Sequence, residues 1–81
     1  MNNKIEVKVK KVMSETFNCK QKEINKNTSI HQLQRWDSIN HFLLISNLEQ
    51  AFKIKLQPGE AETMISFKII YATMKSYAKK N

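Results

Sequence analysis

The sequence predicts an all-α domain, a four-helix bundle with a long first loop and a short third helix. The chain has one glycine and one proline among 81 residues, whereas a β-rich fold needs many tight turns that favour these two residue types. Apolar residues also recur at helical spacing near both ends of the chain. With 41% apolar residues, we expect one domain over residues 1–81 and no separate catalytic domain.

The first half of the chain is expected to contain two helices and a long connection. Residues 5–17 predict a helix because apolar side chains recur on one face. These side chains are Ile5, Val9, Val12, Met13 and Phe17. Residues 18–37 form a polar connection of a length that is often functional. Its expected core anchors are Ile24, Ile30, Leu33 and Trp36. The second helix is expected over residues 38–52, with Asp37 as its N-cap.

The last third of the chain is expected to contain a short helix and a final helix. Pro58 and Gly59 mark a turn, and residues 60–65 then form one short helix. Ser66 is the expected N-cap of a last helix over residues 67–78.

The predicted second helix has apolar residues on two nearly opposite sides. At about 100° per residue, one group consists of Leu44, Ile45, Leu48, Ala51 and Phe52, and the other of Ile39, Phe42, Leu43 and Ser46. If the first group faces the core of a small bundle, the second is exposed, and an exposed apolar stripe marks a binding surface. The alternative is a helix that is buried on both sides.

Ser38 opens this helix beside the second group. Because it follows a long loop, its hydroxyl is expected to be accessible. An attached phosphodiester would lie near the positive end of the helix dipole. Taken alone, however, a serine beside Asp37 at a helix start is also an ordinary capping arrangement.

The sequence around Ser38 resembles the attachment motif of acyl carrier proteins. Residues 36–41 read Trp-Asp-Ser-Ile-Asn-His, similar to the family's Asp-Ser-Leu/Ile motif and to a Trp-Asp-Ser-Ile-x-His subgroup often linked to specialised pathways outside bulk fatty-acid synthesis. Residues 48–54 are similar to the family's Leu-Glu-x-x-Phe-x-Ile helix end. Residues 60–67 are similar to its short third helix and the entry to its fourth, so the resemblance covers essentially the whole chain.

By this resemblance the chain is a carrier and not an enzyme. Ser38 would carry a 4′-phosphopantetheine arm, transferred from coenzyme A by a phosphopantetheinyl transferase that brings its own divalent metal. The arm would hold acyl intermediates as thioesters and present them to acyl-loading and acyl-transfer enzymes. Asp37 would cap the helix and orient the transferase, while Ile39, Phe42 and Ser46 match positions that touch partner enzymes. We expect a monomeric, cytoplasmic protein.

Charge is where the sequence departs from that family. Typical members are acidic along the second helix, whereas this chain has a net charge of +7. Neutral residues, namely Asn40, Leu43 and Gln50, stand at the corresponding exposed positions, and Glu49 is the acid inside the helix. We therefore expect apolar docking of partners with little charge steering. The residues expected to dock partners are Ile39, Phe42, Leu43 and Ser46.

The positive charge also leaves a second function class open, a small basic helical module that binds nucleic acid or an anionic membrane surface. The lysines that could supply such a surface are Lys8, Lys10, Lys11, Lys79 and Lys80. However, lysines occur in nearly every segment, and no helix presents Arg, Asn and Gln together for base readout. We therefore expect a dispersed, solvated positive surface and no specific nucleic-acid binding.

Catalytic residues are not expected in this sequence. Asp37, Ser38 and His41 lie too close together to form the line of orienter, nucleophile and base that a triad needs, and no Gly-x-Ser-x-Gly elbow is present. His41 is instead expected to pack against Trp36 or a loop carbonyl.

Metal, disulfide and membrane-spanning features are not expected either. Cys19 has no partner cysteine in the chain, so a disulfide or a cysteine-built zinc site within one chain is excluded, and a lone thiol suits a reducing cytosol. His31 is expected to be solvated. No apolar run approaches the roughly 18 residues that a membrane span needs.

Overall fold

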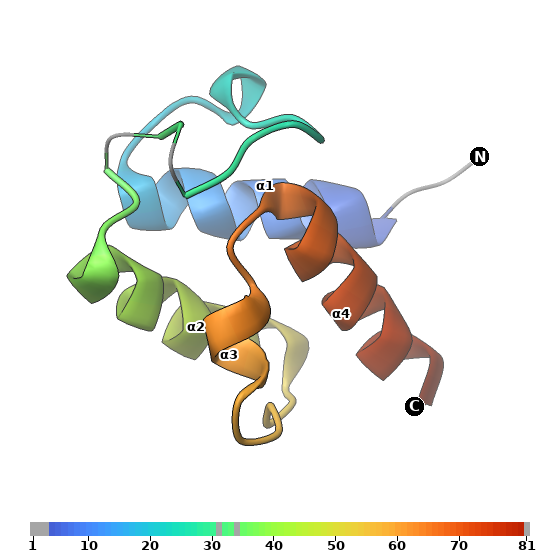
Figure 1. Ribbon diagram of the computed structural model, residues 1–81. Helices are drawn as coiled ribbons and strands as arrows, with labels where there is room; N and C mark the ends of the chain where they lie inside the picture. Colours follow the sequence, from blue (N-terminus) through green and yellow to red (C-terminus); the bar gives the residue numbers. More distant parts are fainter. Residues whose placement is uncertain (1–3, 31, 34, 81) are drawn as a thin grey trace.

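The computed structural model describes residues 4–30, 32–33 and 35–80 (Figure 1). Within these residues the regular structure is helical, apart from one isolated β-bridge. The elements are α1 (Lys4–Phe17), the 3₁₀ turn η1 (Gln21–Glu23), α2 (Ser38–Phe52), α3 (Glu60–Thr63) and α4 (Phe67–Lys80). The predicted all-α class is therefore confirmed for the described residues.

Helix α1 packs against both α2 and α4. Its predicted apolar face is buried except for Ile5, which is partly buried, and Lys4, Lys8 and Lys11 lie exposed on the opposite side. The rest of the core comes from α2, α4, the long loop and the residue after α3, namely Ile24, Trp36, Leu44, Leu48, Met64, Phe67, Ile70 and Met74. Each large apolar side chain buried in this way contributes about 1.5–3 kcal/mol relative to exposure.

The long connection between α1 and α2 is anchored at the predicted residues. Ile24 and Trp36 are buried, and Ile30 and Leu33 are partly buried against the core. Residues 28–30 also run antiparallel to residues 65–67 just before α4, joined by backbone hydrogen bonds of 2.8 and 2.9 Å. The loop is therefore tied to both the core and the last helix.

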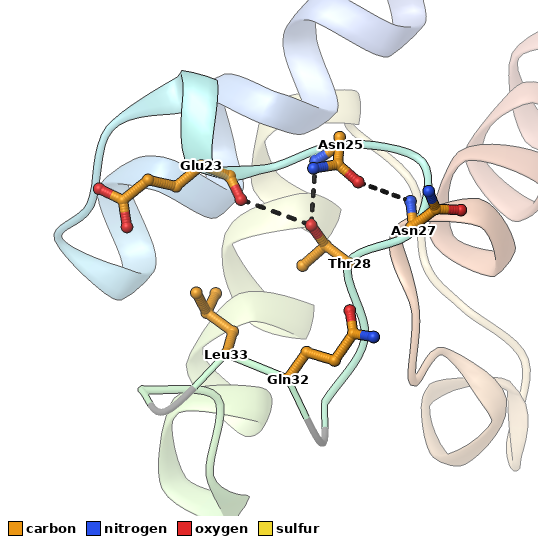
Figure 2. Close-up of a pocket in the computed structure, with 6 residues that line it drawn as sticks. All are labelled: Glu23, Asn25, Asn27, Thr28, Gln32 and Leu33. Carbon is orange, nitrogen blue, oxygen red and sulfur yellow. Dashed lines mark hydrogen bonds between the residues drawn. The ribbon is translucent and has the colours of Figure 1, made fainter.

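Local hydrogen bonds shape the middle of this loop (Figure 2). The hydroxyl of Thr28 accepts from the Asn25 amide at 2.9 Å, and the Asn27 amide donates to the Asn25 side chain at 2.8 Å. Beside them lies a small polar hollow of about 270 Å³. Its lining residues are Glu23, Asn25, Asn27, Thr28, Gln32 and Leu33.

The short third helix ends two residues earlier than predicted. Gly59 precedes it with φ +90°, a conformation that residues with a side chain rarely adopt. The helix ends at Thr63 because Met64 leaves helical geometry, at φ −87° and ψ 61°, with its side chain fully buried. The fourth helix begins as predicted, and the Ser66 hydroxyl accepts from the Ile69 amide at 3.2 Å. It continues two residues beyond its predicted end, to Lys80.

Candidate functional site

Ser38 is the first residue of α2, and its side chain is exposed. The preceding Asp37 is the N-cap, as predicted, because its carboxylate accepts from the Asn40 amide at 2.9 Å. The Asn40 side-chain amide in turn donates to the Arg35 carbonyl at 2.7 Å. These bonds hold the turn that presents the Ser38 hydroxyl to solvent.

His41 joins the loop, α2 and α3 close to this turn. The Trp36 indole N–H donates to His41 Nδ1 at 2.8 Å, and His41 Nε2 lies 2.8 Å from the Ala61 carbonyl oxygen. An indole nitrogen only donates, so Nδ1 accepts, and a neutral imidazole then carries its proton on Nε2 and donates it to Ala61. The expectation that His41 packs against Trp36 or a carbonyl is confirmed, since it contacts both.

Aromatic and cationic contacts fix the same loop end onto α1. The Trp36 ring lies 5.3 Å from the Phe17 ring and 6.0 Å from the His41 ring between centroids. Arg35 donates to the carbonyl oxygen of Phe17 at 3.3 Å and to that of Asn18. A cation at a helix C-terminus is favoured by the helix dipole. The start of α2, where Ser38 lies, is therefore fixed by contacts with α1 and α3.

The exposed apolar stripe on α2 begins next to Ser38. Ile39, Phe42 and Leu43 are 75%, 74% and 45% exposed, whereas Leu48 on the other side is 0% exposed. The two-sided pattern is therefore confirmed for these residues, and a helix buried on both sides is excluded. The prediction that Ser46 is exposed with them was wrong, because Ser46 is partly buried.

The exposed apolar stripe on α2 contains no charged side chain of its own. Glu49 is the acidic residue inside α2. Its carboxylate accepts from the Leu56 amide at 2.9 Å and holds the loop that follows the helix. Helix α2 therefore has a single carboxylate for charge steering, and the Leu56 amide engages it.

A scan against known protein families gives no match to this chain, and no curated protein matches it in sequence. The chemistry of the site therefore rests on its geometry and its sequence motif.

Other candidate chemistry in the described parts of the chain is limited. Within residues 4–30, 32–33 and 35–80, no group of three or more His, Cys, Asp or Glu side chains could hold a metal ion. No helix of the same residues is long and apolar enough to cross a membrane. Cys19 is partly buried, and this burial, together with the Glu23 carboxylate, raises the pKa of its thiol. A raised pKa lowers the fraction of reactive thiolate. His31 lies outside the described residues.

The positive charge is less evenly distributed than the sequence suggested. Helix α1 has four lysines and two glutamates, and α4 has four lysines and no acidic residue, so these two helices carry +6 of the net +7. They also pack against each other. Most of the net charge therefore lies on these two helices, although Lys and Arg residues also occur in the loops. The side chains of Lys79 and Lys80 are outside the described part of the chain.

Some residues that shape the site were not found from sequence. The start of α2 around Ser38 is held by hydrogen bonds of Asn40, Arg35 and the Ala61 carbonyl. No sequence pattern pointed to them, because their bonds depend on how the loop packs against α1 and α2 and how α3 packs against α2.

Proposed function

We propose that this chain is an acyl carrier domain. It tethers acyl intermediates as thioesters on a 4′-phosphopantetheine arm at Ser38 and serves a specialised pathway. The observation that carries the proposal is the exposed Ser38 hydroxyl at the first residue of α2, beside a capping aspartate and an exposed apolar stripe. The Trp-Asp-Ser-Ile-x-His resemblance supports the same assignment.

The residues around Ser38 fit an attached phosphodiester. The side chain is open to solvent, so a bulky transferase active site has access to it. The Asp37 carboxylate already accepts a hydrogen bond from the Asn40 amide. The positive end of the α2 dipole still favours an anion at the start of the helix. When bound, the arm supplies a terminal thiol that carries the acyl group.

The role of this chain in its own modification is simple. The Ser38 oxygen would form a new bond to the phosphorus of coenzyme A that carries pantetheine, the pyrophosphate P–O bond would break, and adenosine 3′,5′-bisphosphate would leave. The serine proton passes to a base of the transferase. Asp37 acts as a positioning residue, because its carboxylate is already engaged as the helix cap.

Partner enzymes would then dock on the apolar stripe beside the arm. Because α2 offers no acidic row, apolar burial must supply most of the docking energy, at roughly 25 cal/mol per Å² before association costs. Phe42 is the best anchor, since it is both aromatic and 74% exposed in the free chain. Tethering raises the effective concentration of the intermediate at each docked active site.

Mass spectrometry tests the proposal directly. The apo chain is incubated with coenzyme A and a broad-specificity phosphopantetheinyl transferase, alongside Ser38→Ala and the matched control Ser46→Ala. We expect one added phosphopantetheine on the parent chain and on the control, and none on Ser38→Ala. Unchanged labelling of Ser38→Ala would overturn the assignment.

The alternative is a basic module that binds nucleic acid or an anionic membrane surface. The net positive charge of α1 and α4 favours a basic binding surface, but these two helices contain no Arg, Asn or Gln for base readout. The mass measurement separates the two classes, because a binding module gains no arm.

A further inference from the structure

Helix α4 has exposed lysines on the side opposite its buried apolar face. Phe67, Ile70 and Met74 are buried in the core. Lys68 and Lys75 are exposed, and the helix contains no acidic residue to offset them. The outer side of α4 is therefore a basic surface that folding itself does not require.

This side is hollowed. An open hollow of about 580 Å³ is lined by Lys68, Tyr71, Ala72, Lys75 and Ser76, and we call it the α4 hollow. The small side chain of Ala72 leaves room between the two lysines. Since they are seven residues apart, they lie about 10 Å apart along the helix axis.

Aromatic rings hold lysine ammonium groups beside the α4 hollow. Lys75 Nζ lies 5.8 Å from the centre of the Tyr71 ring, which stacks on Phe67 at 6.3 Å between centroids. Lys10 of α1 lies 5.8 Å from the Phe67 ring and pairs with Glu6 at 3.2 Å. Among the described side chains, neither Lys68 nor Lys75 forms an ion pair of that kind. Two positive charges at the hollow are thus available to a partner.

We propose that the α4 hollow docks an acidic segment of a partner protein. Exposed ammonium groups about two helical turns apart suit carboxylates on a helix or loop of similar spacing. The α4 hollow is shallow and its lining comes from this one helix, so it suits one short segment better than an extended lipid surface. Nucleic acid fits less well, because the hollow has neither Arg nor the Asn and Gln used for base readout.

The α4 hollow is separate from the stripe beside Ser38. Figure 1 shows α2 beginning at the left of the molecule and α4 lying at the right. An acidic partner on α4 would leave the start of α2 accessible. The inference therefore goes beyond the proposed carrier function and does not depend on it.

Fluorescence anisotropy with defined probes tests this docking. The chain is titrated into a fluorescein-labelled Glu-rich peptide, with a Gln-rich peptide of equal length, duplex DNA and phosphatidylserine vesicles as the competing ligands, at low and near-physiological salt. Binding of the Glu-rich peptide should be preferred and should weaken with added salt.

Two charge-matched double variants locate the binding surface. Lys68→Gln with Lys75→Gln should weaken peptide binding about fivefold or more, as expected for loss of two exposed ion pairs. The control, Lys22→Gln with Lys26→Gln in the long loop, loses the same charge and should change binding less than about twofold. Ser38→Ala should bind the peptide as the parent chain does.

Three results would overturn the inference. They are equal weakening by both double variants, binding of DNA or vesicles more tightly than the Glu-rich peptide, and no preference for the Glu-rich peptide over the Gln-rich one. Circular dichroism of each variant confirms that the helices are intact before binding is compared.

Discussion

Helix α2 should respond very differently to truncation on its two sides. Leu48 is 0% exposed and Leu43 is 45% exposed. Leu→Ala at these two positions therefore makes the same substitution in one helix at two different degrees of burial. Leu48→Ala removes buried methyl groups and leaves a cavity, at a cost of about 2–5 kcal/mol. Phe42→Ala removes a side chain that largely faces solvent, and surface changes of this kind stay within about 0.5 kcal/mol. Leu43 is about half covered, so Leu43→Ala should cost less than Leu48→Ala. For a domain of this size, Leu48→Ala should lower the Tm by roughly 10 °C or more.

Two assays read the two sides separately. Urea unfolding followed by circular dichroism gives the free energy of unfolding, and Leu48→Ala should lower its midpoint without a change in slope. Loading or acyl transfer by a cognate enzyme measures docking. Phe42→Ala should weaken it by about tenfold or more, because a buried aromatic anchor carries a large share of an interface.

The reverse pattern would refute this reasoning. If Phe42→Ala unfolded the chain while Leu48→Ala left its stability unchanged, the core and docking sides would be exchanged. If Phe42→Ala, Leu43→Ala and the parent chain were loaded at equal rates, the stripe would not be the docking surface, whatever the stability results.

Two further predictions follow from the side-chain hydrogen bonds. His41→Leu should cost about 1–3 kcal/mol for each group left unpaired, since it removes the partners of the Trp36 indole and the Ala61 carbonyl; an unchanged urea midpoint and unchanged Trp36 fluorescence would contradict this. The hydrogen bond to Glu60 is the main cause that raises the pKa of Tyr77 above its ordinary value. Because the folded-state pKa is the higher one, this bond stabilises the fold below the ordinary pKa and is lost as pH rises through the raised value. Glu60→Ala should therefore shift the Tyr77 ultraviolet titration to lower pH, with Tyr77→Phe identifying the signal.

Much of the helical framework follows from local sequence. The apolar periodicity of residues 5–17 and 67–78 located α1 and α4 within two residues. Asp37 and Ser66 were found as caps because a side-chain oxygen three residues before an exposed amide needs no tertiary contact to bond it. The predicted end of the short third helix was wrong because burial of Met64, a tertiary contact, draws the chain out of helical geometry.

The candidate site divides in the same way. The sequence alone determined where Ser38 stands, at the start of a helix with apolar residues on two sides, because helical periodicity depends only on spacing along the chain. Only the tertiary structure decided which of those sides is buried, that His41 bonds both Trp36 and Ala61, and that Ser46 is partly covered. It also decided that the lysines of α1 and α4 lie on neighbouring helices. These features join residues that are distant in the sequence or depend on what packs over them, and the packing of the core sets both.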